Sequence, residues 1–146
     1  MTIVETTVDK IFENSHLFDN YYNEGKVSLV PDMNPSKDTY LQLESTGMFR
    51  SIGVFDGDKM VGFSMFYTSI MPHYSKLATT IESIYIEKEY RKYGTGKKLV
   101  DKISEISKES GAVNMFMSAP INSSLDLVAS SFGFTATNTI YIKSLV

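Results

Sequence analysis

Residues 84–99 read IYIEKEYRKYGTGKKL, and this stretch is the most informative part of the 146-residue chain. Its first three residues are apolar or aromatic, which is typical of a β-strand. Gly94 and Gly96 follow a charged run, and the apolar positions of an amphipathic helix begin at Leu99. Glycines between a strand and a helix let backbone N–H groups converge on a ligand, and the helix N-terminus adds partial positive charge. The turn at residues 91–97 is therefore predicted to bind an anion.

Basic side chains surround the same turn. Lys97 and Lys98 fall in the first helical turn, where cations oppose the helix dipole. A phosphate or pyrophosphate would neutralise them together with Lys88, Arg91 and Lys92. A solvated basic face, with glycines that serve only the turn, is the alternative interpretation.

Two well-known phosphate loops do not match this turn. A P-loop requires its first glycine where Arg91 stands and a hydroxyl where Lys98 stands. A dinucleotide-binding fingerprint requires Gly or Ala at position 99, which is Leu. Neither loop is present.

Outward from the turn, the N-terminal side is predicted to hold two helices and three strands. Apolar spacing predicts a first helix from Val4 that ends before Gly25, and Asn34 and Pro35 open a second that Gly47 ends. Strands are expected at residues 48–55, 60–70 and 78–86, the first two joined as a hairpin at Asp56–Gly57.

On the C-terminal side, the helix behind the glycines should end at Gly111. A strand at 113–118 should run parallel to the one at 78–86, because a helix separates them. Asn122 or Ser123 caps a last helix, and residues 134–143 are expected to close the sheet. The fold class is thus α/β (mixed α+β), a single domain over residues 1–146, with a mixed sheet of five to seven strands and about four flanking helices.

Composition excludes several kinds of chemistry. The chain has no Cys and only two His, so thiolate metal sites and a Cys nucleophile are excluded, and a His-based metal site or relay is disfavoured. The net charge of −3 argues against a nucleic-acid or anionic-membrane surface. The N-terminus has no signal-peptide pattern, and the longest apolar stretch, residues 61–71, is too short to span a bilayer. A cytoplasmic protein without a membrane partner is expected.

The sequence Arg91-Lys92-Tyr93-Gly94-Thr95-Gly96 matches a known pattern, Arg/Gln-x-x-Gly-x-Gly/Ala. It follows an apolar strand and opens an amphipathic helix, and Phe132-Gly133-Phe134 lies further on. In these features the whole chain resembles the GNAT superfamily of N-acetyltransferases, including small phage-encoded members. The resemblance implies a GNAT-like fold and acetyl-CoA as cosubstrate, with no metal. It is also the sole basis for expecting a homodimer.

The resemblance implies where acetyl-CoA would lie. The backbone of Ile84, Tyr85 and Ile86 would bind the pantetheine arm like an added strand, and this strand would splay from residues 113–118. The backbone amides of the turn would hold the pyrophosphate, and these belong to Arg91, Lys92, Tyr93, Gly94, Thr95, Gly96 and Lys97. Asn122 would meet the pantetheine from the other side, although a plain helix cap is the alternative.

Glu82 is the predicted general base. A GNAT-like reaction is direct attack of an amine on the thioester in a ternary complex, and the amine must first lose a proton. Glu82 lies two residues before Ile84, where some members of the family carry a carboxylate that acts through water. A sheet-surface carboxylate or an ion-pair partner is the alternative.

The acid that protonates the leaving thiolate is missing from its usual position. The family commonly has a Tyr four residues before the Gly of Gly-Phe, and here that residue is Ala129. Tyr85, Tyr141 or Ser130 is a candidate replacement. A thiolate whose thiol has a pKa of about 8.5 also leaves without an acid.

The leading prediction is an acetyl-CoA-dependent N-acetyltransferase that acts on a small-molecule or peptide primary amine. The first alternative, motivated by Ala129, is a catalytically silent acyl-CoA-binding or partner-binding protein on the same fold. A nucleotide-binding protein that uses the glycine turn is the second. Residues 25–49 and 71–78 are expected to line the acceptor site, but their composition does not identify the amine.

Overall fold

A computed structural model of the chain describes residues 1–146, which contain one five-stranded sheet in the order β1-β2-β3-β4-β5. The strands are β1 (Thr2–Thr6), β2 (Phe49–Asp56), β3 (Lys59–Met71), β4 (Lys76–Ile86) and β5 (Ala112–Met117). Neighbours from β1 to β4 are antiparallel, and β5 is parallel to β4. The predicted hairpin and the predicted parallel pair are both confirmed.

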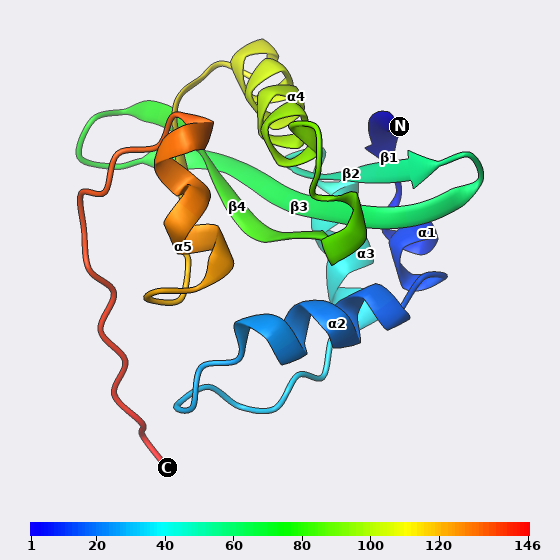
Figure 1. Cartoon of the computed structure of the whole chain (residues 1–146). Helices are drawn as coiled ribbons and strands as arrows, with labels where there is room; N and C mark the ends of the chain where they lie inside the picture. The colour runs from blue at the N-terminus through cyan, green and yellow to red at the C-terminus, as the bar shows by residue number, and fades with distance from the viewer.

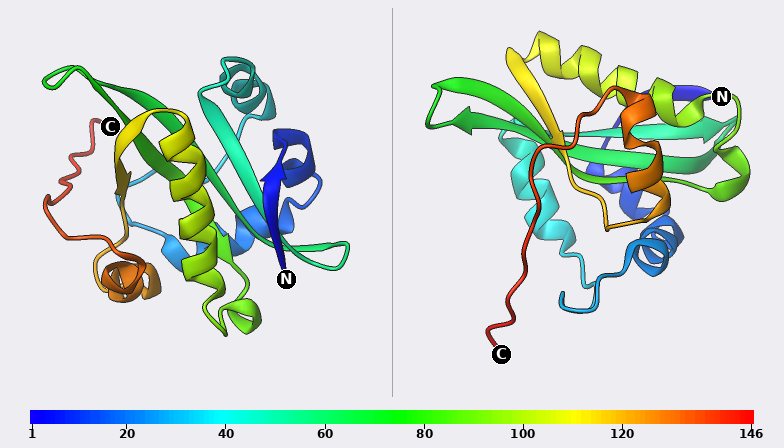
Figure 2. Two further views of the ribbon diagram at one scale, coloured as in Figure 1. Left: turned by 90° about the horizontal axis from the view of Figure 1, so that it is seen from above. Right: turned by 60° about the vertical axis from the view of Figure 1, so that its left-hand side comes forward.

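Five α-helices flank the sheet: α1 (Val8–Phe12), α2 (His16–Gly25), α3 (Lys37–Ser45), α4 (Thr95–Glu109) and α5 (Ser124–Val128). Two 3₁₀ turns, η1 (Lys88–Tyr90) and η2 (Ala129–Phe132), complete the ordered elements. Helix α4 covers one face of the sheet, and α1, α2 and α3 cover the other (Figures 1 and 2). The mixed α+β class is confirmed. No helix combines the length and the apolar character that a membrane crossing requires.

Apolar side chains pack into two clusters, one on each face of the sheet. The first joins Leu99, Ile103 and Ile106 of α4 to the strands. The second joins α1 and α2 to β2 and β3, with Phe63 completely buried at its centre. The sheet is therefore buried on both faces, which fixes the direction in which each central strand side chain points.

The N-terminal prediction needs a correction, because residues 2–6 form strand β1 rather than the start of a helix. Val4 is 41% exposed, whereas Ile3 packs against the cluster beneath α4. The strand pairs with β2, so a partner distant in sequence decides its conformation. The Thr7 side chain then accepts a hydrogen bond from the Lys10 N–H and caps α1. A turn at residues 13–15 separates α1 from α2, which adds one helix to the predicted number.

The second helix begins two residues later than expected. Ser36, not Asn34, caps α3, since its side chain accepts a hydrogen bond from the Thr39 N–H. Gly47, with φ of 75°, follows the end of the helix as predicted.

The predicted closing strand at residues 134–143 is wrong. This segment has no regular secondary structure and runs away from the domain as an extended tail (Figures 1 and 2). Ile140 and Tyr141 are exposed, and no strand pairs with the tail. Its β-branched and aromatic residues favour a strand only where a neighbouring strand receives them. The outer edge of β5 consequently stays unpaired.

Candidate active site

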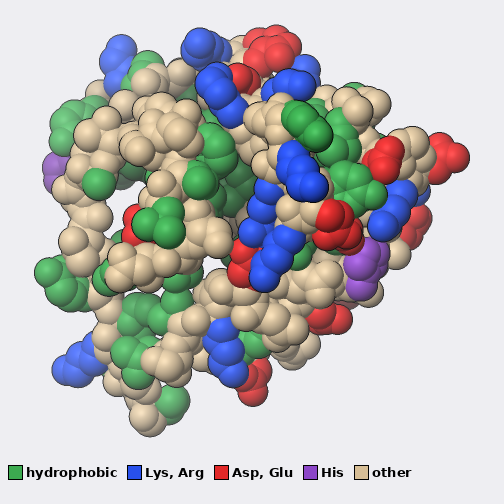
Figure 3. All heavy atoms as spheres, viewed as in Figure 1, with side chains coloured by type: hydrophobic (Ala, Val, Ile, Leu, Met, Phe, Trp, Pro, Cys, Tyr) green, Lys and Arg blue, Asp and Glu red, His purple; other side chains and the backbone are tan.

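Strands β4 and β5 part at the level of the predicted cofactor strand. Their parallel pairing ends at Ile81 and Met117, while β4 continues to Ile86. A cavity of about 370 Å³, called here the β4 cavity, opens beside the end of β4, on the edge that β5 no longer covers. Residues of α2, the loop after it, α5 and η2 line its other sides, and Figure 3 shows the surface hollowed between α5 and α2. The free backbone edge of β4 can receive an extended ligand as an added strand.

A bulge in β4 places Glu82. Ser83 pairs with Met65 of β3 and Ile81 pairs with Phe66, so Glu82 is an extra residue on this strand. Side chains of a regular strand point alternately to the two faces of the sheet, and the extra residue shifts this alternation by one position. As a result Ile81, Ile84 and Ile86 all pack on the face that α4 covers. Glu82 instead reaches α3 on the opposite side, where its carboxylate lines the β4 cavity.

Two tyrosines surround the Glu82 carboxylate. The Tyr40 hydroxyl of α3 donates a hydrogen bond to Oε1 of Glu82 over 2.7 Å. Burial, and then the Glu82 charge, raises the pKa of Tyr40 well above its usual range and raises the pKa of Tyr21 in the same direction. Both phenols therefore stay protonated at neutral pH. No Lys, Arg or His forms an ion pair with Glu82, so the ion-pair interpretation of this residue is not what the structure shows.

The glycine turn presents free backbone amides. Tyr93 and Gly94 both adopt left-handed conformations, with φ of 58° and 74°. The Lys98 N–H binds the Gly94 carbonyl, but the N–H groups of Gly96 and Lys97 have no acceptor within the chain. Unpaired amides at the start of a helix are a suitable cradle for a phosphate.

Gly96 has a packing role that the sequence does not reveal. A Cβ on Gly96 would lie 2.8 Å from Cζ of Phe132, because η2 packs directly against the start of α4. Gly94, by contrast, has open space around it and is required for its positive φ. The two glycines thus serve different physical needs.

The positive charge at the turn is smaller than its composition suggests. The Arg91 guanidinium donates to both carboxylate oxygens of Glu24 on α2, at 2.7 and 2.6 Å, and its Nε donates to the Ile86 carbonyl. This pairing lowers the pKa of Glu24, chiefly through the hydrogen bond. Lys97 pairs with Asp101 at 2.8 Å. The cations without a carboxylate partner are Lys88, Lys92 and Lys98, and Lys and Arg side chains gather over η1 and the start of α4 in Figure 3.

Most of the predicted site residues lie together. Those that line the β4 cavity are Glu82, Ile84, Tyr85, Ile86, Arg91 and Gly96. Those on the adjoining turn are Lys92, Tyr93, Gly94, Thr95 and Lys97. Thr95 is buried, and its hydroxyl donates a hydrogen bond to the Lys92 carbonyl. Asn122 and Ser130 are exposed and do not line the cavity, whereas Ser123, the cap of α5, does.

Sequence reasoning did not find three residues of this site. Tyr21 and Glu24 come from α2 and Tyr40 from α3, and each meets β4 or the glycine turn across a long sequence separation. No local pattern distinguishes them from other polar residues of short helices. Their contacts hold α2 and α3 against the cavity.

The five-stranded mixed sheet, the separation of its parallel strands and the free backbone amides at the start of α4 agree with an acetyltransferase fold. The model of the acetyltransferase (GNAT) family matches residues 15–134. The chain therefore belongs to the GNAT family. Within the described residues no group of His, Asp or Glu side chains is arranged to hold a metal ion.

Solved structures with the same fold include enzymes of different specificity. An aminoglycoside acetyltransferase from an uncultured soil metagenomic sample, in complex with sisomicin, has a TM-score of 0.78 and 19% identity over 99% of this chain and 95% of its own. The ribosomal-protein-alanine N-acetyltransferase of Brucella melitensis biovar Abortus 2308 has a TM-score of 0.72 and 18% identity over 98% and 99%. Glucosamine-6-phosphate N-acetyltransferase of Arabidopsis thaliana has a TM-score of 0.75 and 13% identity over 99% and 98%. No curated protein matches the chain in sequence.

Proposed function

We propose that the protein transfers an acetyl group from acetyl-CoA directly to a primary amine. The pantetheine arm would extend along the free edge of β4 at Ile84, Tyr85 and Ile86. The pyrophosphate would lie on the amides of residues 91–97. The unpaired N–H groups of Gly96 and Lys97 and the early end of the β4–β5 pairing support this placement.

Glu82 is proposed as the base that takes the amine proton, directly or through one water. Presenting an amine of pKa about 10.4 as the free base at pH 7 costs about 4.6 kcal/mol. The amine nitrogen then bonds to the thioester carbonyl carbon, and the carbon–sulfur bond breaks to release the CoA thiolate. The observation that carries this proposal is that the Glu82 carboxylate and the open edge of β4 line one cavity.

Tyr85 is the proposed proton donor to the leaving thiolate. It lines the β4 cavity, and its phenol is the acidic group nearest in sequence to the proposed pantetheine strand. Burial, followed by the nearby charge of Glu24, raises its pKa, which keeps the hydroxyl protonated but makes it a weaker acid than a free tyrosine. Ser130 and Tyr141 are exposed and lie outside the cavity, which makes both of them weaker candidates than Tyr85.

The test is acetyl transfer by Glu82→Gln against a panel of amines. We expect kcat to fall by about 10²- to 10⁴-fold while the affinity for acetyl-CoA, measured by calorimetry, stays the same. Glu105→Gln, on the exposed side of α4, is the matched carboxylate control and should keep full activity. Binding of acetyl-CoA without turnover on any amine would support the silent binding protein, and binding of ATP in place of acetyl-CoA would support the nucleotide-binding protein.

A further inference from the structure

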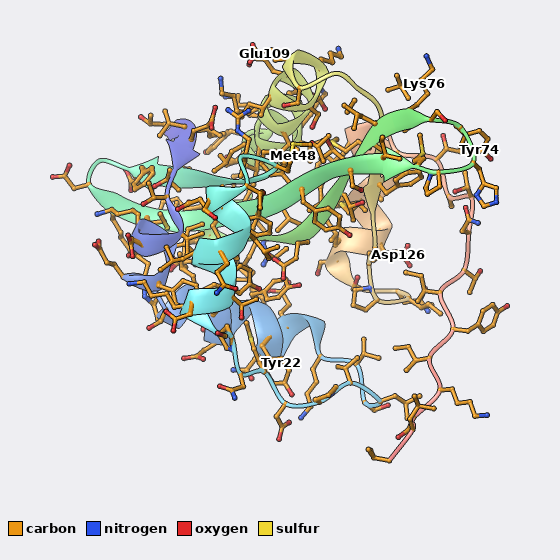
Figure 4. All side chains as sticks on the ribbon, turned by 180° about the vertical axis from the view of Figure 1, so that it is seen from behind. Tyr22, Met48, Tyr74, Lys76, Glu109 and Asp126 are labelled. Carbon is orange, nitrogen blue, oxygen red and sulfur yellow. The ribbon has the colours of Figure 1, made fainter.

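A second cavity shares the lining residue Glu82 with the β4 cavity. It has a volume of about 560 Å³ and lies between α3 and the strands β2 and β3, and we call it the α3 cavity. Figure 4 labels Met48, one of its lining residues, where the chain passes from α3 into β2. Its lining residues are Asn34, Pro35, Ser36, Thr39, Tyr40, Leu43, Thr46, Met48, Phe49, Tyr67, Thr68 and Glu82. Glu82 is the one residue that lines both cavities.

The α3 cavity contains one negative charge and no positive charge. Glu82 is the single charged residue of its lining, which includes no Lys, Arg or His. The lysine nearest in sequence, Lys37, is paired with Asp9 at 2.8 Å. The unpaired lysines of the site, Lys88 and Lys92 among them, lie at the glycine turn beside the β4 cavity instead.

The hydroxyl groups of the α3 cavity are mostly committed to the protein itself. The Thr39 hydroxyl donates to the Ser36 hydroxyl, and the Thr46 hydroxyl donates to the Leu43 carbonyl. The Thr68 hydroxyl shares a hydrogen bond with Thr79. The donors of the wall that stay free, on Asn34, Ser36 and Tyr67, are neutral, so the cavity offers a phosphate or a carboxylate no counter-ion.

We propose that the α3 cavity holds the body of the acceptor and selects a primary amine whose other groups carry no negative charge. The ammonium end is attracted to Glu82, whereas an anionic substituent in the same cavity is repelled by this carboxylate and finds no counter-ion. This inference rests on the proposed function. It further defines the acceptor as an uncharged or cationic organic amine, and it excludes phosphorylated and carboxylated amines as good substrates.

The test compares pairs of amines that differ by one anionic group. Suitable pairs are cadaverine and lysine, tyramine and tyrosine, and glucosamine and glucosamine 6-phosphate. Release of the CoA thiol at saturating acetyl-CoA measures kcat/KM for each. We expect the member without the anionic group to be preferred by about tenfold or more in every pair that reacts.

A positive charge placed in the α3 cavity should weaken or reverse the preference for the amine without an anionic group. Met48→Lys adds a cation at a lining residue that is 42% exposed, so the longer side chain can be accommodated. We expect the ratio between the pair members to fall by about tenfold or more in favour of the anionic one. Leu43→Lys, at the same exposure, is the second variant in case the first does not fold. Val113→Lys, on the exposed surface of β5 and outside both cavities, should leave the ratio unchanged.

These measurements distinguish a failure of charge selection in the α3 cavity from a failure of acetyl transfer itself. Equal rates within the pairs, or a ratio that Met48→Lys and Leu43→Lys do not move, would overturn the proposed charge selection while acetyl transfer itself stands. Absence of transfer to every amine, with acetyl-CoA bound, would overturn the proposed function and the charge selection together.

Discussion

At the scale of single residues, the hydroxyl of Ser83 is unusual because it is buried without a hydrogen-bond partner. Ser83 is 4% exposed and lines the β4 cavity beside Glu82. Ser51 is equally unpartnered and buried, but it lines neither cavity. An unpaired buried hydroxyl lowers stability by about 1 kcal/mol or more unless a ligand reaches it. The two serines form a matched pair that differs in access to the cavity.

We predict that Ser83→Ala and Ser51→Ala leave the free energy of unfolding unchanged or raise it by up to about 1 kcal/mol, since each removes an unpaired polar atom. Only Ser83→Ala should weaken acetyl-CoA binding, because only Ser83 lines the β4 cavity, where the ligand is proposed to bind. Urea unfolding and calorimetry measure the two quantities. Equal effects of both variants on binding would contradict a ligand contact at Ser83.

The ion pair between Glu24 and Arg91 should make stability depend on pH. The pKa of Glu24 is lowered in the folded state, so its contribution is present at neutral pH and is lost as the pH falls through the folded pKa. Glu24→Gln should cost about 1 kcal/mol near pH 7, after allowance for solvent screening of a partly exposed pair. The difference from the natural chain should shrink below about pH 4.

Urea unfolding from about pH 7 to about pH 3 measures this dependence. Asp101→Asn, which removes the exposed Lys97 pair on α4, should change stability by no more than about 0.5 kcal/mol. A Glu24→Gln difference that stays constant down to the lowest pH would show that the charge of Glu24 is not responsible.

Single residues also show how far the sequence can predict the site. The residues of the glycine turn could be predicted because they are contiguous and each type has a clear chemical role, and Glu82 could be proposed from its position in the family that the chain resembles. Tyr40 could not, because its role comes from a contact over 42 positions that only the packing of α3 creates. Asn122 and Ser123 were equivalent candidates for a cap, and the choice between them depends on the backbone, which is left-handed at Asn122.

At the scale of elements, the contact between η2 and α4 makes Gly96 sensitive to substitution. Gly96→Ala would bring a methyl group to 2.8 Å from the Phe132 ring, which must move. We predict a loss of about 1 to 3 kcal/mol in the free energy of unfolding and weaker acetyl-CoA binding. Gly25→Ala, with no atom within 4 Å of the added methyl group, should leave stability within about 0.5 kcal/mol. Chemical denaturation of the two variants side by side measures the difference.

Elements that form from local pattern could be predicted, and elements that need a distant partner could not. The hairpin of β2 and β3 is signalled by its own turn, where Gly57 has φ of 60°. Strand β1 forms because β2 lies beside it, and the tail after Phe134 stays irregular because no strand does. Helical apolar spacing wrongly predicted a helix at the first segment, and strand tendency wrongly predicted a strand at the second.

At the scale of the whole molecule, the tail contributes little to the packed domain. Its side chains at Ile140, Tyr141 and Leu145 are exposed, whereas Phe134 packs on the α4 cluster. A chain that ends after Thr135 should have a Tm within about 2 °C of the full chain. A chain that ends after Val128 loses Phe132 and Phe134 and should melt more than about 5 °C lower. Scanning calorimetry measures the Tm of the full chain and of the two truncated chains. A large fall in Tm for the chain that ends after Thr135 would show that the tail packs against the domain.

The bulge in β4 has a consequence for how this protein can change in evolution. Because Glu82 is the inserted residue that turns Ile84 and Ile86 toward α4, the position of the carboxylate and the orientation of the core side chains are set by the same insertion. A point substitution can replace the carboxylate and keep the fold. Deletion of the residue would turn the following isoleucines to the wrong face of the sheet. One substitution can therefore remove the proposed base, whereas moving the carboxylate along the strand would also reorient the core side chains.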